Sequence, residues 1–258
     1  MANLYKKDID SFLSGRIRQL YALLVVEIEQ VCLSDILRRS EGYFLAFKNV
    51  TLIGDFIQVG INRAISPIEE RLFHSLLVDL AIFICGKVYG GTKSSAEGID
   101  LEFEKDDTKY IVTIKSGPNW GNSRQIAAMK RDFNRAKKIL HTNAPDTNIV
   151  AICGCGYGRD NKPDKGEYLK YCGQKFWEFV SGNEFLYTEI IEPLGHKAKE
   201  RNEKFLESYS QIINKFTIEF ANEFCTNNKI DWEKLVKFNS SIVPPKRITP
   251  KTAKIKHG

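Results

Sequence analysis

The sequence predicts an α/β (α+β) fold in which a mixed β-sheet is flanked by helices, with additional N- and C-terminal helices. Three observations predict it. Residues 98–115 alternate as the two strands of a hairpin do, a helical pattern and a buried strand follow over 124–153, and long apolar patterns of helical spacing lie near both ends. The chain has 258 residues, of which 43% are hydrophobic and 27% charged, a globular composition.

The N-terminal part of the chain predicts helices. Residues 5–38 and 54–65 carry apolar side chains at helical spacing. The stretch Ser66-Pro67-Ile68-Glu69 then has the composition of a helix start, because Ser is a good N-cap, Pro suits the first helical position and Glu completes a capping box. We expect this helix to end at the glycine pair 90–91.

The hairpin of residues 98–115 has a predicted two-residue turn at Asp106-Asp107. This turn sets the register, in which Glu104 lies opposite Lys109 and Asp100 opposite Thr113. Side chains alternate along a strand, so one face carries acids together with a lysine and the other packs into the core. The members of the first face are Asp100, Glu102, Glu104, Ile111, Thr113 and Lys115, and those of the second are Leu101, Phe103, Tyr110, Val112 and Ile114.

The segment after the hairpin continues as a loop over 116–125 and a basic helix over 124–140. A buried strand over 148–153 follows, and the β–α–β order indicates that it lies parallel to its neighbour. A long Gly-rich loop (154–173), a short helix (174–182) and a long helix (195–226) complete the pattern. The long helix could close the core or form a dimer seam.

Positive charge is concentrated locally, although the net charge is only +6. Between Lys115 and Lys138 there are seven basic residues and one acid, and the tail from Lys246 has five basic residues and no acid. Such clustering favours a polyanionic partner, while a solvated helix face and a loose tail are the alternative.

Location and redox state follow from composition. No apolar run reaches the roughly 20 residues that span a bilayer, and the N-terminus lacks a secretory signal, so we expect a cytoplasmic protein without a membrane partner. The six cysteines form no disulfide framework. Cys153, Cys155 and Cys172 fit buried thiols better than a zinc site, because no Cys-x-x-Cys spacing or nearby histidine accompanies them.

The acidic face of the hairpin suggests metal chemistry. Like charges on neighbouring strands destabilise a sheet, and a bound cation would relieve them. Carboxylate ligands without His or Cys favour Mg²⁺, and Lys115 could hold a water or meet charge that develops on a phosphate. An exposed hairpin with solvated charges is the alternative.

Gly98-Ile99-Asp100, a short hairpin and 110–115 (YIVTIK) resemble the active-site core of the PD-(D/E)xK nuclease superfamily. The segments 94–104 (SSAEGIDLEFE), 114–125 (IKSGPNWGNSRQ), 172–182 (CGQKFWEFVSG) and 190–200 (IIEPLGHKAKE) further resemble a family of type II restriction endonucleases. The resemblance covers about residues 65–235. It implies a restriction-endonuclease-like domain over 1–240, with a catalytic core at about 66–182, helical additions at 1–65 and 195–240, and a basic flexible tail at 241–258.

The superfamily pattern is incomplete at one position. It assigns its aspartate to Asp100 and its lysine to Lys115, but the acid two residues before the lysine falls on Thr113. The resemblance implies that an acid on a neighbouring helix can substitute. Glu70 is the preferred donor, because its helical phase lies at the edge of the apolar stripe, with Glu69, Glu102 and Glu97 as alternatives. The implied metal ligands are Asp100, one of these glutamates and the Ile114 carbonyl, which would hold one or two Mg²⁺ ions.

DNA contacts are expected from the two loops. Donors and acceptors at a helix N-terminus suit phosphates and base edges. The candidates are Asn119, Trp120, Asn122, Ser123, Arg124, Gln125, Lys130, Arg159, Lys162, Lys165, Tyr168 and Lys170. Trp120 could stack on a base or anchor its loop in the core, and the lysines of the second loop could simply be solvated.

The resemblance implies a Mg²⁺-dependent endonuclease that leaves 5′-phosphate ends. It implies a homodimer that reads a short palindromic site in double-stranded DNA, and a cognate DNA methyltransferase in the same system. Two alternatives stay open: a DNA-binding protein on a nuclease scaffold inactivated at Thr113, and a repair or junction nuclease.

Overall fold

The computed structural model describes residues 6–40, 42–195 and 202–242. The chain divides into two compact units, each built from two stretches of sequence. The first unit consists of Met1–Leu20 and Arg71–Asn202, and the second of Tyr21–Glu70 and Glu203–Gly258. Where the sequence predicted one domain with helical additions, most of those additions form the second unit. The basic tail lies outside the described residues from 243 onward.

The first unit contains a five-stranded mixed sheet in the order β1-β2-β3-β4-β5. Strands β1 (Thr92–Lys93), β2 (Leu101–Lys105) and β3 (Thr108–Lys115) are antiparallel neighbours, and β4 (Asn148–Cys155) and β5 (Leu169–Cys172) continue the sheet in parallel with β3. The predicted parallel strand is confirmed. β5 lies inside the segment predicted as a single loop, because four residues are too few to show a period.

The hairpin of β2 and β3 has the predicted turn. Asp106 and Asp107 adopt φ angles of 50° and 54°, the left-handed backbone that a type I′ turn requires at both positions. The register is also as predicted, from Lys105 opposite Thr108 to Leu101 opposite Val112. The strand pairing ends at Leu101, so the predicted pairing of Asp100 with Thr113 is not part of it.

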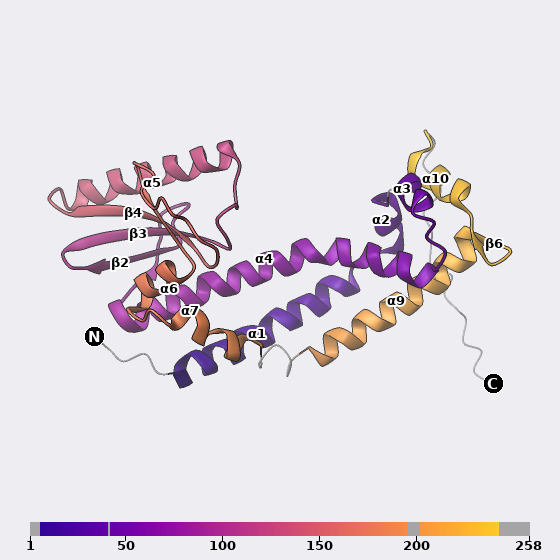
Figure 1. The fold of residues 1–258 in the computed structure, drawn as a ribbon, viewed down its shortest axis with the longest axis horizontal. Helices are drawn as coiled ribbons and strands as arrows, with labels where there is room; N and C mark the ends of the chain where they lie inside the picture. The colour runs from indigo at the N-terminus through magenta and orange to yellow at the C-terminus, as the bar shows by residue number, and fades with distance from the viewer. Residues whose placement is uncertain (1–5, 41, 196–201, 243–258) are drawn as a thin grey trace. The chain divides into compact units, whose positions relative to one another are not determined.

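Helices cover both faces of the sheet (Figure 1). On one face, α5 (Ser123–Asn143) packs Met129 and Phe133 against a cluster that includes Ile111. On the other, α6 (Gln174–Ser181) places the ring of Phe176 2.2 Å from where a Cβ on Gly154 would lie. The face predicted to be polar is therefore largely covered, and Ile111 is only 1% exposed.

A single helix, α4 (Ile53–Tyr89), replaces the two helices predicted on either side of Ser66. The predicted start at Ser66 is wrong, and Pro67 lies inside the helix. A proline costs roughly 3 kcal/mol in a helix interior. Buried apolar side chains continue on both sides of it, from Ile61 and Ile65 to Leu76, and each contributes about 1.5–3 kcal/mol, so together they outweigh that cost. The predicted end is confirmed, since Gly90 follows with φ of 71°.

Length and composition alone would also allow α4 to cross a membrane, and it is the one such helix in the described part of the chain. The core helix of a soluble protein passes the same test. The sequence showed no uninterrupted apolar run here because polar residues such as Asp79 divide it.

The second unit is mainly helical. The helix predicted over 5–38 is divided into α1 (Lys6–Glu29), whose N-terminal part belongs to the first unit, and α2 (Leu33–Arg38). The remaining elements of this unit are α3 (Gly42–Phe47), α9 (Glu203–Phe224), a small hairpin of β6 (Cys225–Thr226) and β7 (Lys229–Ile230), and α10 (Trp232–Ser240). Phe216, Phe220 and Phe224 of α9 pack into a core with Phe56 and Ile57 of α4. α7 (Leu186–Glu189) belongs to the first unit.

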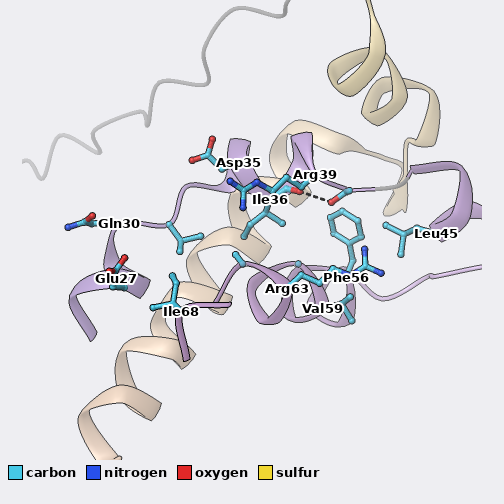
Figure 2. Close-up of a pocket in the computed structure, with 14 residues that line it drawn as sticks. Glu27, Gln30, Asp35, Ile36, Arg39, Leu45, Phe56, Val59, Arg63 and Ile68 are labelled. Carbon is cyan, nitrogen blue, oxygen red and sulfur yellow. Dashed lines mark hydrogen bonds between the residues drawn. The ribbon is translucent and has the colours of Figure 1, made fainter. Parts of the chain in front are cut away.

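A cavity of about 240 Å³ lies within the second unit (Figure 2). Its lining includes Phe56 and Arg63 of α4 and Ile36 and Arg39 from α2 and the residue after it. None of the predicted site residues lines it, so the candidate active site belongs elsewhere.

Candidate active site

Asp100 lies immediately before β2 and is fixed against β3. Its backbone N–H donates to the Val112 carbonyl over 2.9 Å, and its carboxylate Oδ2 accepts from the Ile114 N–H over 2.6 Å. A side chain held at the end of a strand in this way has little freedom, as a catalytic carboxylate requires.

Lys115 is the last residue of β3, one position beyond the N–H that Asp100 accepts. Its ammonium lies 4.8 Å from the centre of the Trp120 ring. Among the residues that the structure describes, no carboxylate forms an ion pair with it. A half-buried ammonium without a carboxylate partner is available to an anionic ligand. The structure therefore brings the two predicted motif residues, Asp100 and Lys115, to the same end of β3.

Thr113 is 2% exposed and its hydroxyl is used locally. Its Oγ1 donates to the Gly98 carbonyl over 2.5 Å. The hydroxyl therefore secures the residues that lead into Asp100, and in this conformation it is not available to a water or a phosphate. Thr113 was predicted as a catalytic residue, but its geometry is that of a positioning residue.

The three glutamates near the hairpin have basic partners. Glu102 lies 3.4 Å and Glu104 3.7 Å from the ammonium of Lys109, on the same face of the sheet. Glu97 pairs with Arg135 of α5. The charge repulsion that suggested a metal ion is thus relieved by Lys109, and the argument for a metal from clustered acids does not hold here.

Glu69 and Glu70 lie in the middle of α4, not at a helix start, so neither caps an N-terminus. They are the last two residues of the first stretch of the second unit, Tyr21–Glu70. Glu70 is exposed and Glu69 half-buried, and this burial raises the pKa of Glu69. Their part in the site stays a prediction.

His74 is a site residue that the sequence analysis missed. It lies on α4 one turn after Glu70, and its Nδ1 is 3.2 Å from the hydroxyl of Ser116. Burial lowers the pKa of His74 and the charge of Lys115 lowers it further, while Asp100 opposes both effects. The i, i+4 spacing to a candidate acid was the pattern in the sequence that could have identified it.

A cavity of about 380 Å³ lies in front of these residues. It is lined by His74, Lys115, Ser116, Gly117, Pro118, Asn119, Trp120 and Tyr157. Among the described residues that line it none is acidic, and six of the side chains carry hydrogen-bond donors. It lies in the first unit, beside the catalytic motif.

The loop after β3 contains several of the residues that were predicted to contact DNA. Asn122 caps α5 by accepting from the N–H groups of Arg124 and Gln125, and the Gln125 side chain accepts from the Asn122 N–H. Their amide oxygens are therefore used within the protein. Ser123 and Arg124 are exposed at the helix N-terminus, where an anion would be favoured. Trp120 packs against the core cluster beside α5, which agrees with the loop-anchor alternative.

The loop before β5 is more ordered than its composition indicated. Tyr168 is 8% exposed and packs near Phe133, so its ring cannot reach a base in this conformation. Lys165 and Lys170 both pair with Asp160, at 3.0 and 3.4 Å. Lys130 of α5 pairs with Glu167, whereas Arg159 and Lys162 are exposed.

The donor atoms of the described residues bear on two metal hypotheses, a Mg²⁺ site at Asp100 and a zinc site at the cysteines. Asp100 and the Ile114 carbonyl offer the hard oxygen atoms that Mg²⁺ prefers, with water and phosphate oxygens completing its shell in such sites. Among the described residues, no three or more His, Cys, Asp and Glu side chains are grouped to hold a metal. Cys153, Cys155 and Cys172 are free buried thiols, as the sequence favoured.

A mixed sheet lies between helices, with Lys115 at the end of its central strand β3, Asp100 bonded to that strand from just before β2, and a basic helix after them, which is the arrangement expected of a nuclease core. A family model described as "Type II restriction endonuclease EcoO109I" matches residues 7–202. The chain therefore belongs to this family of type II restriction endonucleases, as its motifs predicted, and DNA is the substrate that the family implies. No curated protein matches the chain.

Proposed function

We propose that this protein is a Mg²⁺-dependent endonuclease that hydrolyses both strands of DNA at a short palindromic site and leaves 5′-phosphate and 3′-hydroxyl ends. The observation that carries the proposal is the fixed carboxylate of Asp100 next to Lys115. A carboxylate held by the Ile114 N–H and an ammonium without a carboxylate partner are the two charged groups that phosphodiester hydrolysis needs side by side.

Each residue of the site has its own proposed role in phosphodiester hydrolysis. Asp100 and the Ile114 carbonyl would hold Mg²⁺. When bound, Mg²⁺ makes a coordinated water more acidic and offsets the charge of the phosphate. Lys115 stabilises the negative charge that develops on the phosphate oxygens and aligns the attacking water. Glu70 is proposed as the carboxylate that compensates for Thr113, with Glu69 and Glu102 as alternatives; the ion pair of Glu102 with Lys109 makes it the weakest of the three.

The biological setting follows from the same proposal. A palindromic site is read by a symmetric protein, so we propose a homodimer. We also propose that the enzyme is cytoplasmic. The cell's own DNA would then need protection at the recognition sites, so we propose a cognate DNA methyltransferase in the same system.

One observation favours a second function, a DNA-binding protein that no longer cuts. The acid of the motif is replaced by Thr113, whose hydroxyl is bonded to Gly98. A protein of this kind would bind DNA without cleaving it.

Cleavage of a plasmid separates the two functions. Incubated with Mg²⁺, the protein should convert supercoiled and linear plasmid into discrete fragments, and chelation should stop the reaction. Asp100→Asn and Lys115→Met should lose at least about 100-fold in rate while retaining DNA binding. Asp107→Asn, in the exposed turn at the far end of the hairpin, and Lys229→Met, exposed on β7, are matched controls.

Binding without cleavage by the unaltered protein would favour the second function. Full activity of either motif variant would remove the assignment of the site. Glu70→Gln, Glu69→Gln and Glu102→Gln, compared at several Mg²⁺ concentrations, identify the compensating acid as the one whose loss raises the Mg²⁺ requirement.

A further inference from the structure

The cavity beside Lys115 has the chemistry of an anion site. Its side chains supply an ammonium, two hydroxyls, an amide, an imidazole and an indole N–H, and none of the described residues that line it carries a carboxylate to compete for them. At about 380 Å³ it has room for a phosphodiester and several waters. Lys115 is fixed within it by the Trp120 ring, so a ligand would meet a positioned charge.

His74 contributes a neutral donor to this cavity from a different element. Burial and the charge of Lys115 lower its pKa, against the opposing charge of Asp100, and this favours the uncharged imidazole. Its Nδ1 faces the Ser116 hydroxyl at 3.2 Å. When Ser116 donates to Nδ1, the ring proton lies on Nε2, and the imidazole is held as a hydrogen-bond donor in a fixed orientation.

The position of Ser116 connects His74 to the catalytic strand. Ser116 directly follows Lys115, and its carbonyl accepts from the Tyr157 N–H over 3.0 Å, while the Lys115 carbonyl accepts from the Gly156 N–H over 2.9 Å. The backbone of Lys115 and Ser116 is therefore fixed by two hydrogen bonds from the segment after β4, and with it the residue whose hydroxyl faces the imidazole. A histidine with only a packing role in the core would not be expected to line a polar cavity.

We propose that this cavity receives a phosphodiester group of the DNA and that His74 contacts that phosphate through Nε2 while Ser116 holds Nδ1. This inference rests on the proposed nuclease function and extends it, because His74 lies outside the motif formed by Asp100 and Lys115. It assigns α4 a direct role in substrate binding. Anion binding there would be shared by a charged donor, Lys115, and a neutral one, His74.

Substitution of His74 by asparagine or by glutamine distinguishes the roles of its two ring nitrogens. In His74→Asn the amide lies near the former Nδ1 and retains the contact with Ser116, whereas in His74→Gln it lies near the former Nε2. We expect His74→Ala and His74→Asn to lower the single-turnover cleavage rate by roughly 10- to 100-fold, the range for one hydrogen bond to a charged group. We expect His74→Gln to stay within about threefold of the unaltered protein. His141→Ala, an exposed histidine on α5, is the matched control and should have no effect.

Methylphosphonate duplexes identify the phosphate by binding alone. Each duplex replaces one phosphate of the DNA site that the protein binds by an uncharged group, and affinity is measured with Ca²⁺ in place of Mg²⁺. At the contacted phosphate, the duplex should weaken binding by His74→Ala less than binding by the unaltered protein, because only the Lys115 contact is then left to lose; at all other positions the two losses should multiply.

The proposal is overturned if the losses multiply at every phosphate, or if His74→Asn retains activity and His74→Gln does not. Equal loss in both variants with a lowered melting temperature would also overturn it, since that result indicates a structural role. If the unaltered protein cuts no DNA, the proposed nuclease function fails, and the methylphosphonate result still decides the phosphate contact.

Discussion

Asp160 connects the loop before β5 to the loop after β3, and its replacement by Asn tests this connection. Its carboxylate accepts from the Lys162 N–H at 2.9 Å and from the Lys165 ammonium at 3.0 Å, and it lies 3.4 Å from the Lys170 ammonium. Lys170 in turn donates to the Pro118 carbonyl over 2.8 Å, in the loop that lines the proposed phosphate cavity. Asp160→Asn keeps the shape but removes the charge.

The expected loss follows from burial. The Asp160 and Lys170 side chains are 13% and 15% exposed, so water compensates little for the lost charge. Hydrogen bonds to charged groups contribute about 1.5–3 kcal/mol, and Lys170 keeps its bond to Pro118, so we expect Asp160→Asn to lower the free energy of unfolding by about 2 kcal/mol. The pair of Lys130 with Glu167 is a matched control in the same region, with side chains 34% and 49% exposed. Exposed pairs contribute about 0–1 kcal/mol, so Glu167→Gln should cost less than about 0.5 kcal/mol.

The pH dependence has a definite sign. Burial alone would raise the pKa of Asp160, but the hydrogen bonds from Lys165 and the Lys162 N–H, with the lysine charges, outweigh it and lower the pKa. The stabilisation is therefore present above the ordinary aspartate pKa of about 3.9 and is lost as the pH falls through the lower pKa of the folded protein.

Urea unfolding followed by circular dichroism at pH 7 and below pH 3.5 measures both effects. The difference between Asp160→Asn and the unaltered protein should be largest at pH 7 and shrink at the acidic pH. Equal losses for Asp160→Asn and Glu167→Gln, or a difference that does not change with pH, would refute the reasoning.

Two further predictions concern the residues around Lys115. Thr113→Val keeps the shape and removes the hydrogen bond to Gly98, so we expect a loss of about 1 kcal/mol in urea unfolding and a plasmid cleavage rate within about threefold of the unaltered protein; a far larger loss of rate would make Thr113 catalytic. Trp120→Phe keeps an aromatic face under Lys115 and Trp120→Leu does not, so the cleavage rate of the leucine variant should be roughly threefold to tenfold lower than that of the phenylalanine variant. Equal rates would show that the ring does not position the lysine.

Local patterns predicted much of the first unit. The Asp106-Asp107 turn fixed the register of the hairpin, and alternation along β2 and β3 identified the core-facing side chains, because both depend on residues close in sequence. The end of α6 at Gly182, with φ of 71°, follows from the same kind of local rule. The start predicted at Ser66 failed because burial along the whole of α4 outweighed a strong local pattern.

The sequence by itself determined that Asp100 and Lys115 lie at the same end of the hairpin, since strand period and turn length settle which residues meet. Only the tertiary structure decided which charged groups have a partner of opposite charge. Glu102 meets Lys109, Glu97 meets Arg135 and Asp160 meets two lysines, and none of these partners follows from spacing alone. It also decided that His74 reaches Ser116, 42 positions along the chain. Strand geometry acts over a few residues, whereas the packing of helices on the sheet brings together groups that are distant in sequence, and the electrostatics of the site depends on that packing.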